Sequence, residues 1–139
     1  MAGGSFSQTL ASFAADTPKQ ADQIYRKIVL GLGSLIVYGS PVDTGRFRAN
    51  WQFGVDKAPS GDLTKTDKSG AATIGGFATA LPANPTQHVL YLANNLPYAR
   101  RLEYGWSKQA PGGMVRVSML KVEALVAQAV ASTPSGGHP

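Results

Sequence analysis

Apolar residues recur at three- and four-residue steps in the segment that follows Thr17, which is the pattern of a helix with one apolar face. The apolar positions are Ala21, Ile24, Tyr25, Ile28, Leu32, Leu35 and Ile36. Thr17 can cap this helix with its hydroxyl, and Pro18 suits the first helical position, where a backbone N–H has no helical partner. We therefore expect a helix from Pro18 to about Gly39, with Pro41 as a stop.

Two short stretches have the pattern of β-strands. In 49–55 the apolar residues alternate with others from Trp51 onward, which is the period of a strand. In 88–94 four consecutive apolar residues favour a buried strand over a half-exposed edge. Helical spacing returns in three later segments, 74–81, 97–104 and 118–131, the last after an extended start at residue 114.

These elements predict an α+β fold in which a long N-terminal helix and a C-terminal helix pack on a small, mostly antiparallel β-sheet. Leu120 belongs to the apolar pattern of the C-terminal helix, so we expect it to face this core. With 139 residues, 43% of them hydrophobic, the chain is expected to form a single domain. Composition predicts a possible arm at 1–16, a mobile loop at 57–72 and a flexible tail at 132–139.

The chain has no cysteine and a net charge of +5. The lack of cysteine excludes disulfides and thiolate metal sites and is compatible with a reducing cytoplasm. The longest apolar stretch, 28–38, is interrupted by Gly31 and Gly33 and is too short to cross a bilayer, so we expect a soluble protein with no membrane partner. These two glycines lack the other residues of a phosphate-binding loop and are expected to allow close helix packing.

The positive charge also suggests a basic nucleic-acid-binding module, because clustered Lys and Arg attract phosphate. The basic residues are scattered, however, with no run longer than two and no recognisable DNA- or RNA-binding motif. A solvated surface, or one that meets acidic protein neighbours, is therefore favoured, and the nucleic-acid module is kept as the alternative.

Asp43, Thr44 and Gly45 form the tripeptide of retroviral-type aspartic proteases, in which each of two subunits supplies one Asp. That turn normally follows an apolar strand, whereas here it follows the predicted long helix. Arg46 comes directly after it and would oppose a proton shared between two carboxyls. The protease is therefore a third hypothesis. We expect instead that Asp43 caps the next turn and pairs with Arg46 or Arg48.

Metal and cofactor chemistry has little support in the sequence. The two histidines, His88 and His138, and the eight carboxylates show no metal-ligand spacing. We expect no metal, no cofactor and no catalytic residue.

The aromatic–basic segment, 91–119, contains three tyrosines, one tryptophan, four basic residues and one carboxylate, Glu103. Arg100, Arg101 and Lys108 surround this carboxylate in the sequence. Either these charges pair along an exposed helix with little effect on stability, or Glu103 and Arg101 form charge-assisted bonds across a subunit boundary.

The rings of this segment have two interpretations as well. Tyr98, Tyr104 and Trp106 are either core residues or anchors of an interface, because Tyr, Trp and Arg are typical of interface hot spots. Gly105 is expected to form a tight turn that projects the rings on either side of it.

Two motifs together resemble a known family. Segment 40–51 reads Ser-Pro-Val-Asp-Thr-Gly-Arg-Phe-Arg-Ala-Asn-Trp, and segment 91–105 reads Tyr-Leu-Ala-Asn-Asn-Leu-Pro-Tyr-Ala-Arg-Arg-Leu-Glu-Tyr-Gly. A Ser-Lys turn at 107–108 follows. In order and spacing these motifs resemble the neck or tail-completion (head-tail joining) proteins of long-tailed bacteriophages, of the minor tail protein Z type.

The resemblance implies a structural virion protein without a substrate, assembled in the bacterial cytoplasm. Copies would close into a ring, most plausibly a hexamer, that joins a head-side connector or stopper protein to the tail tube or tail terminator protein. Genomic DNA would pass through the ring without sequence-specific binding. The candidate residues at or supporting subunit contacts are Arg46, Arg48, Trp51, Tyr98, Arg101, Glu103, Tyr104, Trp106 and Lys108. The level of the neck that the protein occupies is left open.

Overall fold

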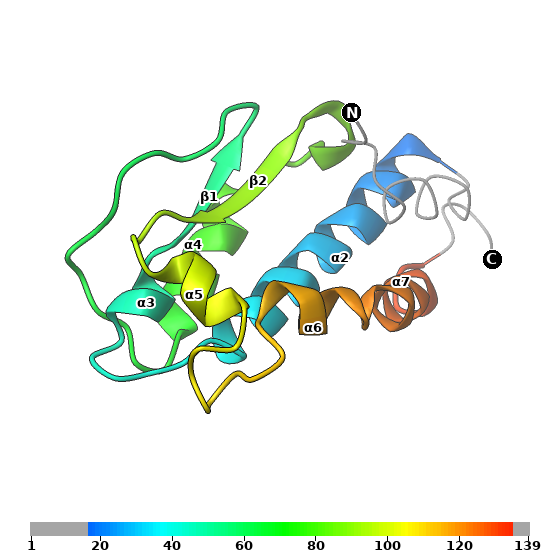
Figure 1. Ribbon diagram of the computed structural model, residues 1–139. Coiled ribbons are helices and arrows are strands. Elements are labelled where there is room, and N and C mark those ends of the chain that lie inside the picture. Colours follow the sequence, from blue (N-terminus) through cyan, green and yellow to red (C-terminus); the bar gives the residue numbers. More distant parts are fainter. Residues whose placement is uncertain (1–16, 135–139) are drawn as a thin grey trace.

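A long helix, α2 (Pro18–Tyr38), is the central element of the structure, a computed structural model that describes residues 17–134 (Figure 1). Thr17 is its N-cap and accepts a hydrogen bond from the backbone N–H of Gln20 at 3.1 Å. Gly39 is its C-cap, and the Gly39 N–H donates to the Leu35 carbonyl. The predicted start and end of this helix are confirmed. The possible arm at 1–16 lies outside the described residues, as do 135–139.

The remaining elements surround α2. In chain order they are α3 (Arg46–Ala49), β1 (Trp51–Val55), α4 (Ala71–Ala80), the 3-10 helix η2 (Pro85–Gln87), β2 (Leu90–Asn94), α5 (Ala99–Glu103), α6 (Val115–Met119) and α7 (Val122–Ala131). Helix α2 packs against α7 and against α4, and α4 also contacts β1 (Figure 1). The α+β class predicted from the sequence is confirmed, with α7 packed chiefly on α2.

Two apolar clusters share the long helix. The first joins α2 to the sheet, α4 and the loops around α5, and contains Ile36, Val37, Phe47, Trp51, Phe77, Leu96, Ala110 and Met114. The second joins α2 to α7 and contains Ile24, Tyr25, Ile28, Val122, Val126 and Ala129. A Cβ on Gly31 would lie 2.9 Å from Leu125, and one on Gly33 would lie 3.2 Å from the Phe77 ring. The close helix packing predicted for both glycines is confirmed.

The sheet is a two-stranded antiparallel ladder in which Trp51 pairs with Asn94 and Val55 pairs with Leu90. Both predicted strands are present. The expectation that the second strand is fully buried is wrong, since Tyr91 is exposed. With two strands in the sheet, each strand is an edge, and the continuous apolar run leaves both Val89 and Tyr91 exposed.

The C-terminal region differs from its prediction. Residues 115–119 are helical rather than extended, and α6 and α7 are separated at Leu120 and Lys121. Here the Leu120 N–H bonds the Val117 carbonyl and the Lys121 N–H bonds the Ser118 carbonyl, the tighter 3-10 spacing. The expectation that Leu120 faces the core is wrong: the break leaves Leu120 85% exposed.

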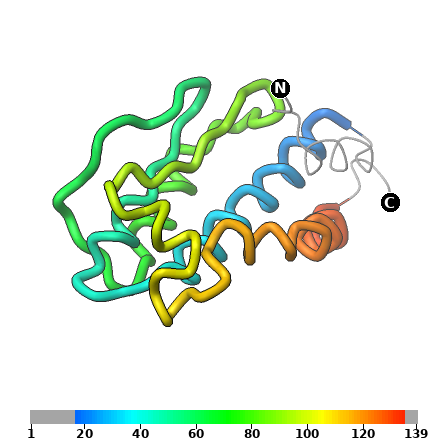
Figure 2. The backbone as a smooth tube through the Cα atoms, in the orientation of Figure 1, coloured from blue at the N-terminus to red at the C-terminus, as the bar shows by residue number. Residues whose placement is uncertain are grey.

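The polar segment predicted as a mobile loop runs from β1 past α3 to α4, and its last residues belong to α4 (Figure 2). Asn50 holds it at Leu63, since the Asn50 amide donates to the Leu63 carbonyl at 2.9 Å and its oxygen accepts from the Leu63 N–H at 2.7 Å. Asp67 caps α4 by accepting from the Thr73 N–H at 2.9 Å. The segment is tied at both points, and its mobility stays a prediction.

The first residues of the predicted flexible tail lie on α2. The Lys27 ammonium donates to the Ser132 carbonyl and to the Thr133 hydroxyl, both at 2.8 Å. The Gln20 amide donates to the Pro134 carbonyl at 2.9 Å. Residues 132–134 therefore hold the C-terminal end of α7 against α2.

Candidate assembly surface

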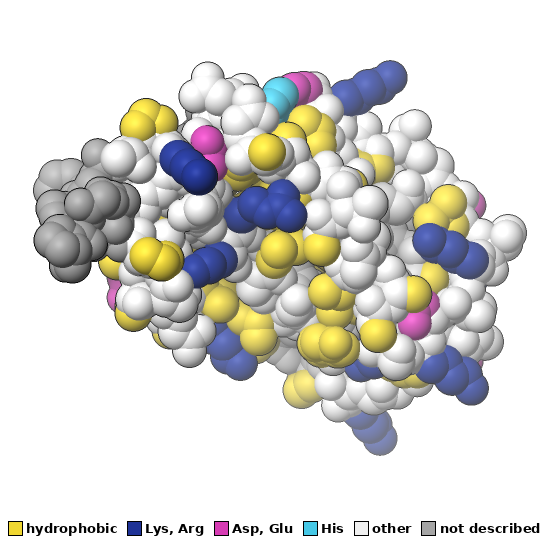
Figure 3. Space-filling view, turned by 180° about the vertical axis from the view of Figure 1, so that it is seen from behind, with side chains coloured by type: hydrophobic (Ala, Val, Ile, Leu, Met, Phe, Trp, Pro, Cys, Tyr) yellow, Lys and Arg dark blue, Asp and Glu magenta, His cyan; other side chains and the backbone are white. Residues whose placement is uncertain are grey.

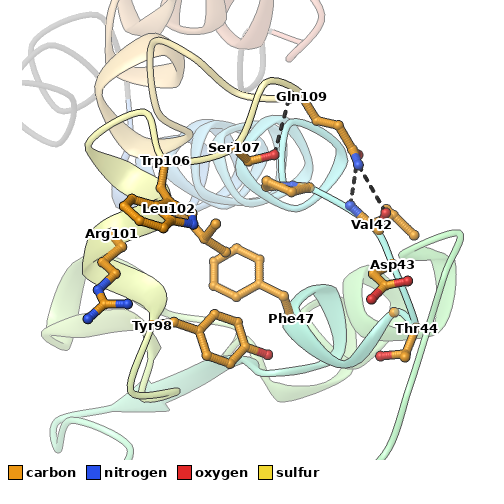
Figure 4. A pocket seen from close by; sticks show the side chains of 12 residues that line it. Val42, Asp43, Thr44, Phe47, Tyr98, Arg101, Leu102, Trp106, Ser107 and Gln109 are labelled. Carbon is orange, nitrogen blue, oxygen red and sulfur yellow. Dashed lines mark hydrogen bonds between the residues drawn. The ribbon is translucent and has the colours of Figure 1, made fainter.

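The two motifs of the sequence meet on one face of the molecule. Between them lies a hollow of about 510 Å³ (Figure 4). Its lining from the first motif is Pro41, Val42, Asp43, Thr44, Gly45 and Phe47, and its lining from the aromatic–basic segment is Tyr98, Arg101, Leu102, Trp106, Ser107 and Gln109. The structure therefore makes one surface from two segments that are more than fifty residues apart, roughly the span between Phe47 and Tyr98.

The floor of the hollow is aromatic and is set by α3. Gly45 has φ +91°, a conformation that glycine adopts without strain, and this N-cap residue directs the chain into α3. Phe47 is buried, and its ring lies 5.9 Å from the Trp51 ring and 6.0 Å from the Tyr98 ring, centroid to centroid. This stack joins the first motif to the second.

A side chain also fixes the distance between the two motifs. Gln109 accepts from the Val42 N–H at 2.9 Å and donates to the Val42 carbonyl at 3.1 Å. Figure 4 shows both bonds at one edge of the hollow. Because one amide satisfies both backbone groups of Val42, the loop after α5 is held against the turn after α2.

Two rings project from the turn after α5. Gly105 has φ +89°, and Tyr104 and Trp106 on either side of it are 64% and 74% exposed. The tight turn and the projecting rings predicted from the sequence are confirmed. The Arg101 guanidinium lies 5.5 Å from the centroid of the Trp106 ring, within cation–π distance. The Arg116 guanidinium lies 4.7 Å from the Tyr104 ring.

Within the chain, Glu103 has a role that the sequence did not suggest. Its carboxylate accepts hydrogen bonds from the N–H groups of Met114 and Val115, each at 2.9 Å, and of Arg116 at 3.0 Å. Arg116 Nε adds an ion pair at 3.1 Å, and the Arg116 guanidinium also donates to the Glu103 carbonyl. Glu103 therefore caps α6 and joins it to α5, and its charge partner is Arg116 rather than Arg100, Arg101 or Lys108.

The environment of Glu103 also changes its acidity. Partial burial raises the pKa of this carboxyl, but the bonds from Val115, Met114 and Arg116 outweigh the burial, so its pKa lies below the ordinary 4.5. The charged form is the one that the fold stabilises.

The two arginines of the first motif, Arg46 and Arg48, also have hydrogen-bond partners within the chain. Arg46 donates to the Leu63 carbonyl at 2.9 Å and lies 3.7 Å from Asp62. Arg48 donates to the carbonyls of Tyr38, Ser40 and Lys68. The expected pairing of Asp43 with either arginine is wrong, because these guanidinium groups are satisfied elsewhere. Thr44, not Asp43, accepts from the Arg46 N–H, at 3.2 Å.

The predicted contact residues therefore fall into two groups. Trp51 is 7% exposed and donates to the Ser40 hydroxyl at 2.8 Å, so it can only support a surface from beneath. Glu103, Arg46 and Arg48 likewise brace the fold. The exposed members are Tyr98, Arg101, Tyr104, Trp106 and Lys108.

Sequence reasoning missed Phe47, Leu102 and Gln109 as parts of this surface. Phe47 and Leu102 stand inside the two motifs, so their place beside Gly45 and Arg101 was the available signal. Nothing in the sequence marked Gln109, whose role depends on the distance between two loops.

The charged side chains are spread over the one face that Figure 3 shows. On the face seen in Figure 3, Lys and Arg are dispersed among hydrophobic and uncharged groups. Within residues 17–134 no three His, Asp or Glu side chains lie together as a metal site. None of the described helices combines the length and apolar character needed to cross a membrane.

Comparison with protein-family models, with curated proteins and with solved structures gives no match to this chain.

Proposed function

We propose that the chain is a structural protein of a long-tailed bacteriophage that forms or completes the ring joining the head connector to the tail tube. The observation that carries the proposal is the joint surface of the two motifs. In the sequence they are separate likenesses to neck proteins, and in the fold they line one hollow. The two motifs therefore form one continuous surface, and a subunit contact needs such a surface.

The chemistry of this surface also supports assembly. Tyr98, Trp106 and Arg101 are exposed beside the hollow, and these residue types dominate the energy of protein interfaces. Large exposed aromatic rings are costly in a monomer and become favourable when a partner covers them. A second exposed apolar region lies on α6 and the α6–α7 break, so one copy has two different surfaces, as a heterologous ring contact needs.

In this role the protein has no substrate and acts by geometry. Copies made in the host cytoplasm close into a ring, most plausibly six-fold, and become part of the virion neck. One face of the ring would meet a head-side connector or stopper protein, and the other the tail tube or tail terminator protein. Genomic DNA passes through without base reading.

The test is a phage genome in which the coding sequence of this chain is deleted. Electron microscopy of the lysate is expected to show DNA-filled heads and separate tails, and the chain supplied in trans should restore joined particles. A Trp106→Ala chain should restore few, whereas a matched Tyr38→Ala chain, which loses an exposed ring outside the hollow, should restore joined particles at the native level. Normal joined particles from the deleted genome would refute the proposal.

A further inference from the structure

The α6–α7 ridge, which we define as Val117, Leu120 and Glu123, has no covering element among the described residues. Val117 is 40% exposed and Leu120 85% exposed, and Glu123 is exposed as well. The Leu120 N–H bonds the Val117 carbonyl at 3-10 spacing, which places these two side chains on one side, and Glu123 follows three residues later in the first turn of α7. The ridge is thus an apolar row that ends in a carboxylate.

The ridge also carries two opposite charges. Lys121 and Glu123 follow Leu120 in the helical turn, and their spacing places them on different sides of the Leu120 side chain. Within residues 17–134 the side chains of Glu123 and Lys121 are exposed, and neither takes part in a hydrogen bond or an ion pair. An exposed leucine is therefore flanked by a free anion and a free cation.

The hollow has the complementary arrangement. In Figure 4 the Arg101 guanidinium lies at one edge, Asp43 lies at the opposite edge, and the rings of Phe47 and Tyr98 lie between them. In the described part of the chain Arg101 has no carboxylate partner and lies over the Trp106 ring, and Asp43 has no side-chain hydrogen-bond partner. A cation, an apolar floor and an anion face outward in a row.

We propose that the α6–α7 ridge of a second copy of this chain occupies the hollow. Leu120 lies on the aromatic floor, Glu123 pairs with Arg101, and Lys121 pairs with Asp43. The charges match only when the ridge enters in one direction, so the contact fixes orientation as well as partner. The inference rests on the proposed ring and names the contact that forms it.

The contact uses different surfaces on its two partners. The hollow belongs to α3 and α5, and the ridge belongs to the junction of α6 and α7. Each copy therefore has one hollow and one ridge. It can bind the ridge of one neighbour in its hollow and place its own ridge in the hollow of another neighbour.

Disulfide trapping tests this contact, because the chain has no cysteine of its own. Two single variants, Thr44→Cys at the edge of the hollow and Leu120→Cys on the ridge, are mixed and oxidised mildly. The proposal predicts a mixed disulfide dimer at a yield about tenfold above that of Leu120→Cys mixed with Thr79→Cys, which places the same substitution on the exposed side of α4. Circular dichroism of each variant confirms that it is folded.

The charge pair is tested in the same assay. With the trapping cysteines present, Arg101→Glu or Glu123→Arg alone should lower the mixed dimer about fivefold or more, because like charges then meet. The two changes together should restore most of the yield. A double variant no better than either single one would overturn the pairing.

Other occupants give different results. If Phe13→Cys traps Thr44→Cys and Leu120→Cys does not, the arm of residues 1–16 fills the hollow and the proposal is wrong. If native mass spectrometry finds a ring while the 44–120 disulfide stays at the control yield, this contact is refuted, and the deletion phage alone decides the neck function. If the disulfide forms and the deletion phage still joins its heads to its tails, the contact stands and the neck function fails.

Discussion

Replacing Glu103 by Gln should destabilise the protein more than any other single change from a carboxylate to an amide in the described chain. Glutamine keeps the size of the side chain, removes its charge, and turns one accepting oxygen into a donor that faces backbone N–H groups. The native carboxylate accepts from three N–H groups at 2.9 to 3.0 Å and from Arg116 Nε at 3.1 Å. Its side chain is 18% exposed, so water replaces few of these bonds.

The magnitude follows from these bonds. A hydrogen bond to a charged group contributes about 1.5–3 kcal/mol, and the loss of a helix cap costs about 0.5–2 kcal/mol. Because Gln retains one accepting oxygen and the effects are not additive, we expect a loss of about 2–3 kcal/mol. The assay is urea unfolding at neutral pH followed by circular dichroism. Glu123→Gln is the matched control, and its exposed carboxylate should change stability by less than about 0.5 kcal/mol.

The pH dependence gives a second readout with a defined sign. The pKa of Glu103 is lowered in the folded protein, so its contribution is complete above the ordinary value of 4.5 and is lost as the pH falls through the lower folded value. The difference between the native chain and Glu103→Gln should therefore be constant near neutral pH and shrink below 4.5. A loss equal to that of Glu123→Gln, or a difference unchanged in acid, would refute the capping role.

Three further substitutions test other parts of the fold by the same unfolding assay. Asp67→Asn should cost about 1–2 kcal/mol, because the carboxylate caps α4 and accepts from both the N–H and the hydroxyl of Thr73; an unchanged midpoint would contradict this role. Gly76→Ala should gain about 0.5–1 kcal/mol, since a Cβ there meets nothing within 4 Å, and a loss would show that the glycine is required. Trp51→Phe should cost about 2–3 kcal/mol through a cavity and the lost bond to Ser40; a cost below 1 kcal/mol would argue against its place in the core.

Much of the fold could be predicted from the sequence, because its main elements are fixed by local rules. The boundaries of α2 follow from Thr17, Pro18 and Gly39, whose effects on helix ends do not depend on distant residues. The close packing at Gly31 and Gly33 could be predicted for a similar reason, since an apolar helix with glycines on it must meet a neighbour.

The sequence predictions are wrong at residues whose contacts lie far away along the chain. Leu120 follows a helical period, yet the break between α6 and α7 leaves it exposed. The start of α6 is fixed by Glu103 from another helix, a contact that no local pattern reports. Proximity in sequence predicts that Asp43 pairs with Arg46 or Arg48, whereas the polar segment between β1 and α4 supplies carbonyls to both arginines.

The candidate surface could be predicted in part. Gly105 between two aromatic residues predicts a turn that exposes both rings, and Tyr104 and Trp106 are exposed. The sequence did not predict that the Asp43 turn lies across the hollow from Arg101, since this depends on the Phe47 ring stack and the Gln109 bridge.

We propose that the hollow formed by the two motifs is a subunit contact in the neck of a phage particle. Electron cryomicroscopy of purified virions would show this contact. We expect a ring of this chain between head and tail, with Leu120 of each copy inside the hollow of its neighbour and Trp106 covered. Particles whose neck lacks the chain, or a ring in which the hollow stays open to solvent, would contradict it.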